Sequence, residues 1–408
     1  MKQCAFTICA KNYLAQAITL RESFKKHNEE DFYIFLSDAV ANEDLKDTSV
    51  VELNETWIPK WKEMAFKYNV IEFSTAIKPF CFGKLFSEDY KKVIYLDPDM
   101  YVVKDLQFVW NTLDNKSIML TPHFFEIYDG KFKGAVSDNS ILAVGIYNLG
   151  YCALADTLNG KKIVTWWKNK LQDQCYDDRD DGTFVDQKWM NFIPAFFPDD
   201  VCISHNEGLN VAIWNLHERE LIIEDGKYYV KGIHGQKDPL SVFHFSGFDP
   251  FNNTVINRRH PQFNITAFPS FKPIIEEYRK AVYENGYKKY HSMMYTFETF
   301  NNGEKINGVQ RRIFRVYLAN GGKYTDPFDV DDVFYQKLKD SNCLTNIHSS
   351  RIGIAKSDKE KGNKLQNKIL VPLFKVIKRS LGFNRYCLML RFFNRIRRFE
   401  FNYFLLKK

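Results

Sequence analysis

Two acidic residues one position apart, Asp97 and Asp99, follow directly after the apolar run 92–96. Carboxylates at this spacing can approach one hard divalent cation from the same turn, and that cation could bridge a diphosphate. The spacing alone is not specific, because it recurs at 178–180 and 329–331, and such pairs are often solvated turns. The preceding apolar run predicts a strand that ends at Asp97, where a ligand crevice is expected, and so favours a metal site.

A strand followed by two such aspartates also begins the haloacid-dehalogenase phosphatases. That motif requires Thr or Val two residues after the second aspartate, but Tyr101 stands there, nearly a hundred residues into the chain. Phosphoryl transfer is therefore the weaker interpretation.

The elements that must position this pair alternate along the first half of the chain. We expect strands at 6–10, 32–36 and 92–96 and helices at 13–26 and 74–86. This order predicts an α/β fold with a mostly parallel sheet and helices on both faces. Further on, we expect a hairpin over 221–230 with an Asp-Gly turn, a strand at 241–245 and a helix at 272–290.

Six motifs in order resemble the family 8 group of GT-A nucleotide-sugar glycosyltransferases, over roughly residues 5–260. They are Ala10-Lys11-Asn12-Tyr13, Thr75-Ala76-Ile77-Lys78-Pro79, Val93-Ile94-Tyr95-Leu96-Asp97-Pro98-Asp99-Met100, Tyr147-Asn148-Leu149-Gly150, Asp186-Gln187 and His244-Phe245-Ser246-Gly247. The resemblance implies the GT-A fold, a Rossmann-like fold of nucleotide-diphospho-sugar transferases, and transfer with retention.

By the same resemblance, each motif has an expected role. Asp97, Asp99 and His244 would hold Mn²⁺ or Mg²⁺, Asn12, Lys78 and Gly247 would contact the donor, and Asn148, Asp186 and Gln187 would line the transfer site. One departure concerns the diphosphate, because the family's late motif continues to a Lys and here that stretch is 248–250. Arg258 or Arg259 could supply that charge.

Each of these residues also has an ordinary structural explanation. His244 alone could be a core or surface histidine, Asn148 a turn residue and Asp186 a helix cap. The cluster 214–219, with Trp, Asn, His and Arg, could line a sugar pocket or be a Trp buried under the neighbouring hairpin. The acidic run 177–181 is expected to be a solvated loop.

Composition predicts a folded protein, since 45% of the 408 residues are hydrophobic and 26% are charged. The eight cysteines form no CxxC pair, which argues against zinc knuckles and disulfide frameworks. No apolar stretch approaches 18 residues, and the N-terminus lacks a signal-peptide pattern. We therefore expect a reduced, cytoplasmic protein.

The positive charge is concentrated at the C-terminus. Residues 361–408 carry a net charge of +12, which leaves −5 for the remainder of a chain of net charge +7. Because large apolar residues alternate with these cations, we expect residues 365–406 to bind an anionic membrane surface. An RNA-binding segment and a docked helix pair are the alternatives, and no nucleic-acid partner is expected.

These observations predict three parts: a GT-A catalytic domain at 1–260, an acceptor-side helical elaboration at 261–348, and a polar linker with a basic tail at 349–408. The expected activity is metal-dependent transfer of a sugar, most simply from a UDP-sugar, to a glycan or lipid-linked acceptor. Its expected setting is surface polysaccharide synthesis at the inner face of the cell membrane. A metal-dependent phosphohydrolase and a non-catalytic, membrane-associated glycan-binding protein remain as alternatives.

Overall fold

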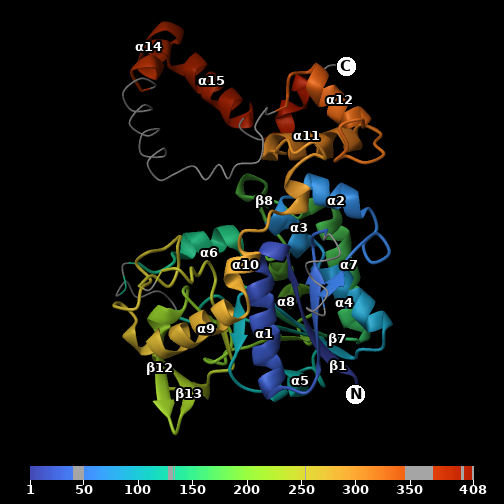
Figure 1. Ribbon diagram of the computed structural model, residues 1–408. Helices are drawn as coiled ribbons and strands as arrows, with labels where there is room; N and C mark the ends of the chain where they lie inside the picture. The colour runs from blue at the N-terminus through green and yellow to red at the C-terminus, as the bar shows by residue number, and fades with distance from the viewer. Residues whose placement is uncertain are drawn as a thin grey trace. The chain divides into compact units, whose positions relative to one another are not determined.

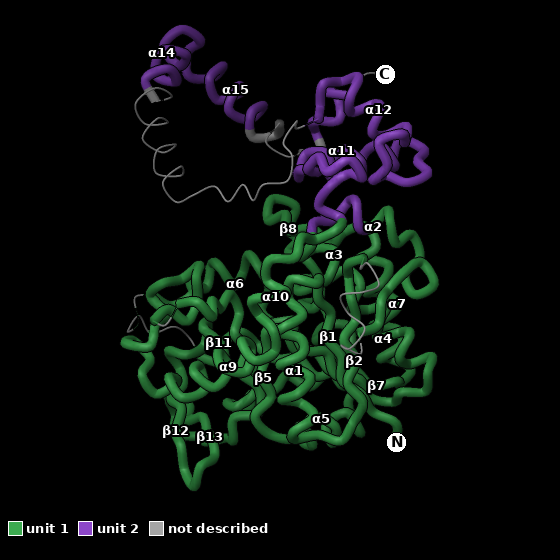
Figure 2. Tube along the Cα trace, in the orientation of Figure 1, with its two compact units in different colours: residues 1–64, 70–296 green, residues 65–69, 297–408 purple. Residues whose placement is uncertain are grey.

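The computed structural model describes residues 1–39, 50–126, 132, 134–252, 254–344, 371–396 and 399–406. The chain divides into two compact units (Figure 2). Unit 1 comprises residues 1–64 and 70–296, and unit 2 comprises residues 65–69 and 297–408. The predicted division at 260/261 remains a prediction about function, and the linker predicted from 349 onward lies outside the described residues up to 370.

Unit 1 is built on a seven-stranded sheet with strand order β10-β6-β7-β4-β1-β2-β3. Its strands are β1 (Gln3–Cys9), β2 (Asp31–Leu36), β3 (Val50–Glu52), β4 (Lys92–Leu96), β6 (Ile118–Leu120), β7 (Tyr151–Ala155) and β10 (Val201–Ile203). Neighbouring strands run parallel except β7, which is antiparallel to both β4 and β6. The predicted mostly parallel α/β sheet is confirmed.

Helices cover both faces of this sheet (Figure 1). Alternate residues of β1 mark the two faces, because side chains along a strand point to opposite sides. Ala5 joins a core cluster with Leu20 and Phe24 of α1 (Leu14–His27). The next residue, Phe6, packs its ring against Phe82 of α4 (Lys78–Ser87), with ring centroids 4.9 Å apart.

The other helices of at least four residues before position 300 complete this architecture. They are α2 (Trp61–Lys67), α3 (Val70–Ala76), α5 (Gln107–Thr112), α6 (Asp138–Val144), α7 (Leu158–Gln174), α8 (Ile193–Phe196), α9 (Lys272–Glu284) and α10 (Tyr287–Tyr290). The helix predicted over 74–86 is wrong in its boundaries, because α3 ends at Ala76 and α4 starts at Lys78. Pro79, which lacks an N–H and fits the first turn of a helix, explains this break.

Three smaller sheets lie beside the main one. They are β11-β15-β5 (Val211–Ala212, Val242–His244, Met100–Val102), β12-β13-β14 (Arg219–Glu224, Lys227–Gly232, Lys237–Pro239) and the pair β8-β9 (Asp177–Asp178, Thr183–Phe184). The predicted hairpin is confirmed as β12–β13, and positive φ angles at Asp225 (49°) and Gly226 (71°) fit its two-residue turn.

Unit 2 is helical in its described residues. It contains α11 (Gly308–Ala319), α12 (Val333–Asp340), α14 (Val371–Leu381), α15 (Phe383–Ile396) and the 3-10 helix η8 (Phe399–Leu405). Phe66, Phe314 and Phe334 lie in its core cluster. Among the described residues, no helix has the length and apolar character needed to cross a bilayer.

Candidate functional site

Several strand ends meet at one edge of the main sheet. β1, β2 and β4 are parallel, so Asn12, Asp38 and Asp97 follow their strands at the same edge. β7 is antiparallel to β4, with Tyr151 opposite Leu96, so Gly150 precedes its strand at this edge as well. The topology therefore collects polar residues from distant parts of the sequence in one place.

Asp97, Asp99 and His244 form a cluster that could hold a metal ion. One ligand atom from each lies within 4.8 Å of the others. His244 Nε2 lies 3.2 Å from Asp99 Oδ1 and 3.7 Å from Asp97 Oδ2. The side chains of Asp97 and Asp99 are 29% and 17% exposed, so solvent reaches the carboxylates while the imidazole is buried. The structure brings the three predicted metal ligands together.

Strand pairing explains how His244 reaches the aspartates. In the small sheet, His244 of β15 stands opposite Met100 of β5, the residue that follows Asp99. His244 Nδ1 lies 3.3 Å from Asn210 Oδ1, which can accept a hydrogen bond from it. This contact orients the imidazole ring so that Nε2 faces the two carboxylates. Burial alone would lower the pKa of His244, but the charges of Asp99 and Asp97 and the hydrogen bond with Asp99 raise it above its usual value.

Gly150 is required by the close approach of the chain to this cluster. A Cβ atom at this position would lie 2.5 Å from His244 Cε1, 2.8 Å from Asp97 Oδ2 and 2.8 Å from Asn148 Oδ1. No side chain fits there without moving those groups. The backbone holds Asp97 from the same side, because Asp97 N–H donates to Gly150 O at 2.7 Å.

Lys78 is a fully buried cation beside the metal cluster. Its Nζ lies 2.8 Å from Asp186 Oδ2 and 3.8 Å from Asp97 Oδ1, and it donates to Leu149 O at 2.8 Å. Burial alone would lower the pKa of Lys78, but the charges of Asp186 and Asp97 raise it above its ordinary value. Burial raises the pKa of Asp186 to about 6, although Lys78 opposes this shift. The pair is charged at neutral pH.

The predicted transfer-site residues share one hydrogen-bond network. Gln187 Oε1 accepts from Asn148 Nδ2 at 3.4 Å and from Leu149 N–H at 3.2 Å. Asn148 Oδ1 accepts from Asn210 Nδ2 at 3.1 Å. Asp186, Gln187 and Asn148 are all buried, and these bonds fix Gln187 and Asn148, whereas the ion pair with Lys78 fixes Asp186. Asp186 is an ion-pair partner and not the helix cap considered from the sequence.

The predicted donor-contacting residues lie around this centre with weaker ties to it. Asn12 is half-buried in the 3-10 helix η1 (Lys11–Tyr13). The carbonyl oxygen of Gly247, a residue at φ 68°, accepts a hydrogen bond from the N–H of Arg258. Arg258 is exposed. Burial and the charge of Asp99 raise the pKa of Tyr13, while Arg258 lowers it, so the charges of Asp99 and Arg258 both reach Tyr13.

Trp214 is buried, which rules out an exposed stacking platform at this position. It is 8% exposed, and its ring stands edge-on to His244 with centroids 5.1 Å apart. It therefore packs against the metal cluster. The acidic run 177–181 is mainly exposed, as expected, and forms β8 and a 3-10 turn.

Sequence reasoning missed three residues that shape the site. Tyr95 donates its hydroxyl hydrogen to Asp97 Oδ1 at 2.6 Å, and it lies two residues before Asp97, on the same side of the strand. Asp38 follows β2 at the same edge and is held by Lys11, so the strand-end rule applied to Asp97 could have found it. Asn210, which links Asn148 to His244, carries no local signal.

No protein-family model matches the chain. Two curated relatives from Bacillus subtilis (strain 168), the uncharacterized proteins YfnF and YfnD, are each 22% identical to it over 250 and 257 residues. The alignments cover 59% of this chain in both cases, and 80% of YfnF and 76% of YfnD.

Several solved structures are similar to the chain at low identity. The galactosyltransferase LgtC, in complex with donor and acceptor sugar analogues, is 15% identical with a TM-score of 0.39, covering 69% of this chain and 95% of LgtC. The bifunctional glycosyltransferase WbbM is 14% identical with a TM-score of 0.39, covering 70% and 51%. Mouse xyloside xylosyltransferase 1 is 14% identical with a TM-score of 0.33, covering 52% and 87%.

These three similar proteins are glycosyltransferases. Because the TM-scores lie below 0.5, we base the function of this chain on its own side chains.

Proposed function

We propose that unit 1 is a metal-dependent GT-A-type glycosyltransferase that moves a sugar from a nucleotide-sugar donor to a glycan or lipid-linked acceptor. One observation carries this proposal: Asp97, Asp99 and His244 converge at a sheet edge beside the buried cation Lys78. Departure of a nucleoside diphosphate leaves negative charge on the phosphates, and a divalent cation held at this edge, with Lys78 beside it, would stabilise that charge.

The residues present fit a divalent cation. Two carboxylate oxygens and one imidazole nitrogen form a donor set suited to Mn²⁺, while Mg²⁺ would rely more on the carboxylates. Tyr95 and Asn210 hold two of the three ligands by hydrogen bonds, as partners of metal ligands commonly do. When bound, the cation would supply charge neutralisation to a donor diphosphate.

The chain's own groups would do the rest. Lys78 would add a fixed positive charge close to Asp97, held in place by Asp186. Asn148 and Gln187 would present amide groups to the sugar, and Asn12, Gly247 and Arg258 would contact the rest of the donor. We propose transfer with retention of anomeric configuration. Determining the anomeric configuration of the newly formed product by NMR would test this.

Ligand-dependent thermal stability of the full chain tests the nucleotide and the metal together. UDP, GDP and CDP are each added with and without Mn²⁺, because a ligand that binds the folded state raises the unfolding temperature. We expect a metal-dependent rise with one nucleotide, most simply UDP, that is lost in Asp99→Asn. Asp180→Asn, in another aspartate pair with the same spacing, is the matched control and should retain the rise.

Two measurements distinguish the alternatives. A phosphohydrolase would release phosphate from a generic phosphomonoester and lose that activity in Asp97→Asn. A non-catalytic glycan-binding protein would show no metal-dependent rise with any nucleotide, and this result would exclude the transferase.

The C-terminal helices support a second part of the proposal, binding of an anionic membrane surface at the inner face of the cell membrane. Large apolar residues on them are exposed, including Val376 (60%), Phe383 (65%) and Leu388 (62%). Lys375, Lys378, Arg379, Arg385 and Arg391 lie on the same two helices. Apolar groups that enter an interface beside cations fit a lipid-linked acceptor in surface polysaccharide synthesis. Residues 365–370 and 397–398 of the predicted segment lie outside the described residues.

Cosedimentation with vesicles tests this part. We expect the full chain to bind phosphatidylglycerol vesicles and to bind phosphatidylcholine vesicles weakly. Leu388→Ser should reduce binding, whereas Leu142→Ser, which replaces an equally exposed leucine of α6 (68%), should not. Equal binding to both lipids would contradict the electrostatic part of the proposal.

A further inference from the structure

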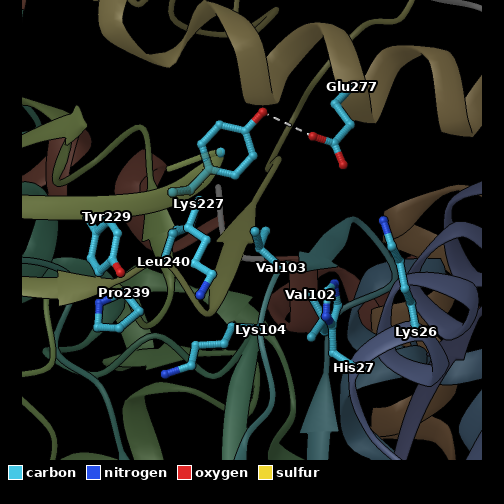
Figure 3. A pocket seen from close by; sticks show the side chains of 12 residues that line it. Lys26, His27, Val102, Val103, Lys104, Lys227, Tyr229, Pro239, Leu240 and Glu277 are labelled. Atoms are coloured by element: carbon cyan, nitrogen blue, oxygen red, sulfur yellow. Dashed lines mark hydrogen bonds between the residues drawn. The ribbon is translucent and has the colours of Figure 1, made fainter. Parts of the chain in front are cut away.

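A cavity of about 530 Å³ lies in unit 1 at the other end of β5 from the metal cluster. It is lined by the last turn of α1, the end of β5 and the two residues after it, the turn and start of β13, the end of β14 with the next residue, and Glu277 of α9. Figure 3 shows Lys104 and Lys227 on one side of this space and Lys26 and His27 on the other. Its volume lies within the range of sites that bind small molecules.

The cavity gathers positive charge. Lys26 lies in α1, Lys227 in β13 and Lys104 in the loop after β5, and all three residues are exposed. Burial, followed by the charge of Lys26, lowers the pKa of His27, so His27 is neutral at neutral pH and offers a hydrogen bond. Cations at the end of α1 are favoured by the helix dipole alone, but Lys104 and Lys227 have no such explanation.

The single carboxylate in the lining is already engaged. Glu277 Oε1 accepts from the hydroxyl of Tyr101 at 2.9 Å, and Oε2 accepts from that of Tyr228 at 3.1 Å, the bond drawn in Figure 3. The nearby Asp105 accepts from Gln107 N–H and is not part of the lining. Among the described residues, therefore, no acid that lines the cavity pairs with its lysines.

An apolar wall stands beside these cations. It consists of Val103, Pro239 and Leu240, with the ring of Tyr229 next to them. Lys237 Nζ lies over one face of that ring, 4.5 Å from its centroid. An aromatic ring with aliphatic neighbours suits the C–H face of a sugar, while the lysines suit a phosphate attached to it. Inorganic phosphate alone would use the cations and leave this wall unused.

We infer that this cavity is a binding site for a sugar phosphate, separate from the metal cluster. The inference is independent of the proposed transferase activity, because it uses different side chains and needs no metal ion. The site would hold the phosphate between Lys104, Lys227 and Lys26 and the sugar ring against Tyr229.

Isothermal titration of the full chain with glucose 1-phosphate and galactose 1-phosphate, in EDTA, tests this inference. EDTA removes metal-dependent phosphate binding at Asp97 and Asp99. The test variant is Lys104→Gln/Lys227→Gln, and the control is Lys162→Gln/Lys280→Gln, which removes two exposed lysines outside the cavity. Both variants lose the same charge and keep the basic tail, so attraction of anions to the tail is equal in the two.

We expect at least one of these sugar phosphates to bind about tenfold more weakly to the test variant than to the control, as expected for lost charge-assisted hydrogen bonds in a partly exposed site. Lys104→Arg/Lys227→Arg should restore most of the affinity, which a folding defect would not allow. Equal affinity in both glutamine variants, or no binding to the unsubstituted chain, would overturn the inference. Binding of glucose or of inorganic phosphate as tight as that of the sugar phosphate would overturn it as well.

Discussion

The two ends of β5 carry opposite charge. Asp97 and Asp99 precede this short strand, beside His244 of its partner strand β15, whereas Lys104 follows it and lines the cavity with Lys227. Because these groups lie at opposite ends of β5, a cation bound at one end and an anion bound at the other would occupy separate sites. One three-residue strand thus separates two kinds of chemistry.

Burial also differs between the two ends. At the metal end, Lys78 and Asp186 are each 2% exposed in their side chains and are paired at 2.8 Å. At the cavity end, the lysines are exposed, and no ion pair among the described residues fixes them. Buried charges must be paired to be tolerated, which couples the metal end to folding, while the exposed lysines leave folding nearly unaffected.

The largest expected effect comes from neutralising one carboxylate at the metal end. We expect Asp99→Asn to lower the rate of metal-dependent sugar transfer by about 10³-fold. The substitution removes a ligand of the metal ion, and the charge of that ion would stabilise the leaving diphosphate. Asp105→Asn, at the other end of β5, should leave the rate within about twofold, as typical of a surface substitution. The rate of nucleotide release from the donor measures the activity of both variants. Equal rates would contradict the assignment of the metal site to the Asp99 end of β5.

The second effect concerns stability. Lys78→Met should lower the free energy of unfolding by about 3–5 kcal/mol, because Asp186 would be left buried and without its cation. Lys104→Met should change it by less than about 0.5 kcal/mol. Denaturant unfolding of the two variants measures the difference. Similar losses of unfolding free energy in both variants would mean that the ion pair between Lys78 and Asp186 does not form in solution.

The third effect is a pH dependence of stability that comes from Asp186 at the metal end. The pKa of Asp186 is raised to about 6 by burial, against about 3.9 for an unfolded aspartate. Between these values the folded state binds more protons, so the free energy of unfolding falls as pH rises and levels off above the folded pKa. From pH 4.5 to 7 we expect a loss of about 2 kcal/mol relative to Asp186→Asn. Parallel pH profiles for the two proteins would contradict the raised pKa.

The local sequence predicted those residues of the site that lie at or next to the end of a strand. Asp97, Asp99 and His244 each adjoin an apolar run, so their placement at strand ends could be predicted and is confirmed. The pairing of Lys78 with Asp186 could not, because it depends on where Pro79 interrupts the helix and on how a segment a hundred residues away folds back.

The cavity at the other end of β5 had no sequence signal. Its lining includes residues 26, 104, 227 and 277, which belong to three elements and the loop after β5 and show no common spacing. The main sheet was easier to predict, because each strand is a local apolar run and strand–helix alternation limits the topology. Contacts between distant segments carry no such periodicity, so only the folded chain brings these lysines together.

The smallest effect tests whether hydrogen bonds to carboxylates act differently at the two ends of β5. Tyr95→Phe removes the hydroxyl that donates to Asp97 Oδ1 at 2.6 Å, and we expect Mn²⁺ to bind about tenfold more weakly. Tyr101→Phe removes a comparable bond, to Glu277 at 2.9 Å, and should leave Mn²⁺ affinity unchanged. Both substitutions cost one tyrosine hydroxyl, so a general loss of rigidity would affect them alike. Metal titration followed by electron paramagnetic resonance separates the two cases: a decrease confined to Tyr95→Phe would mean that Asp97 is oriented by its own strand, whereas equal decreases would mean that β5 transmits disturbance from the cavity to the metal cluster.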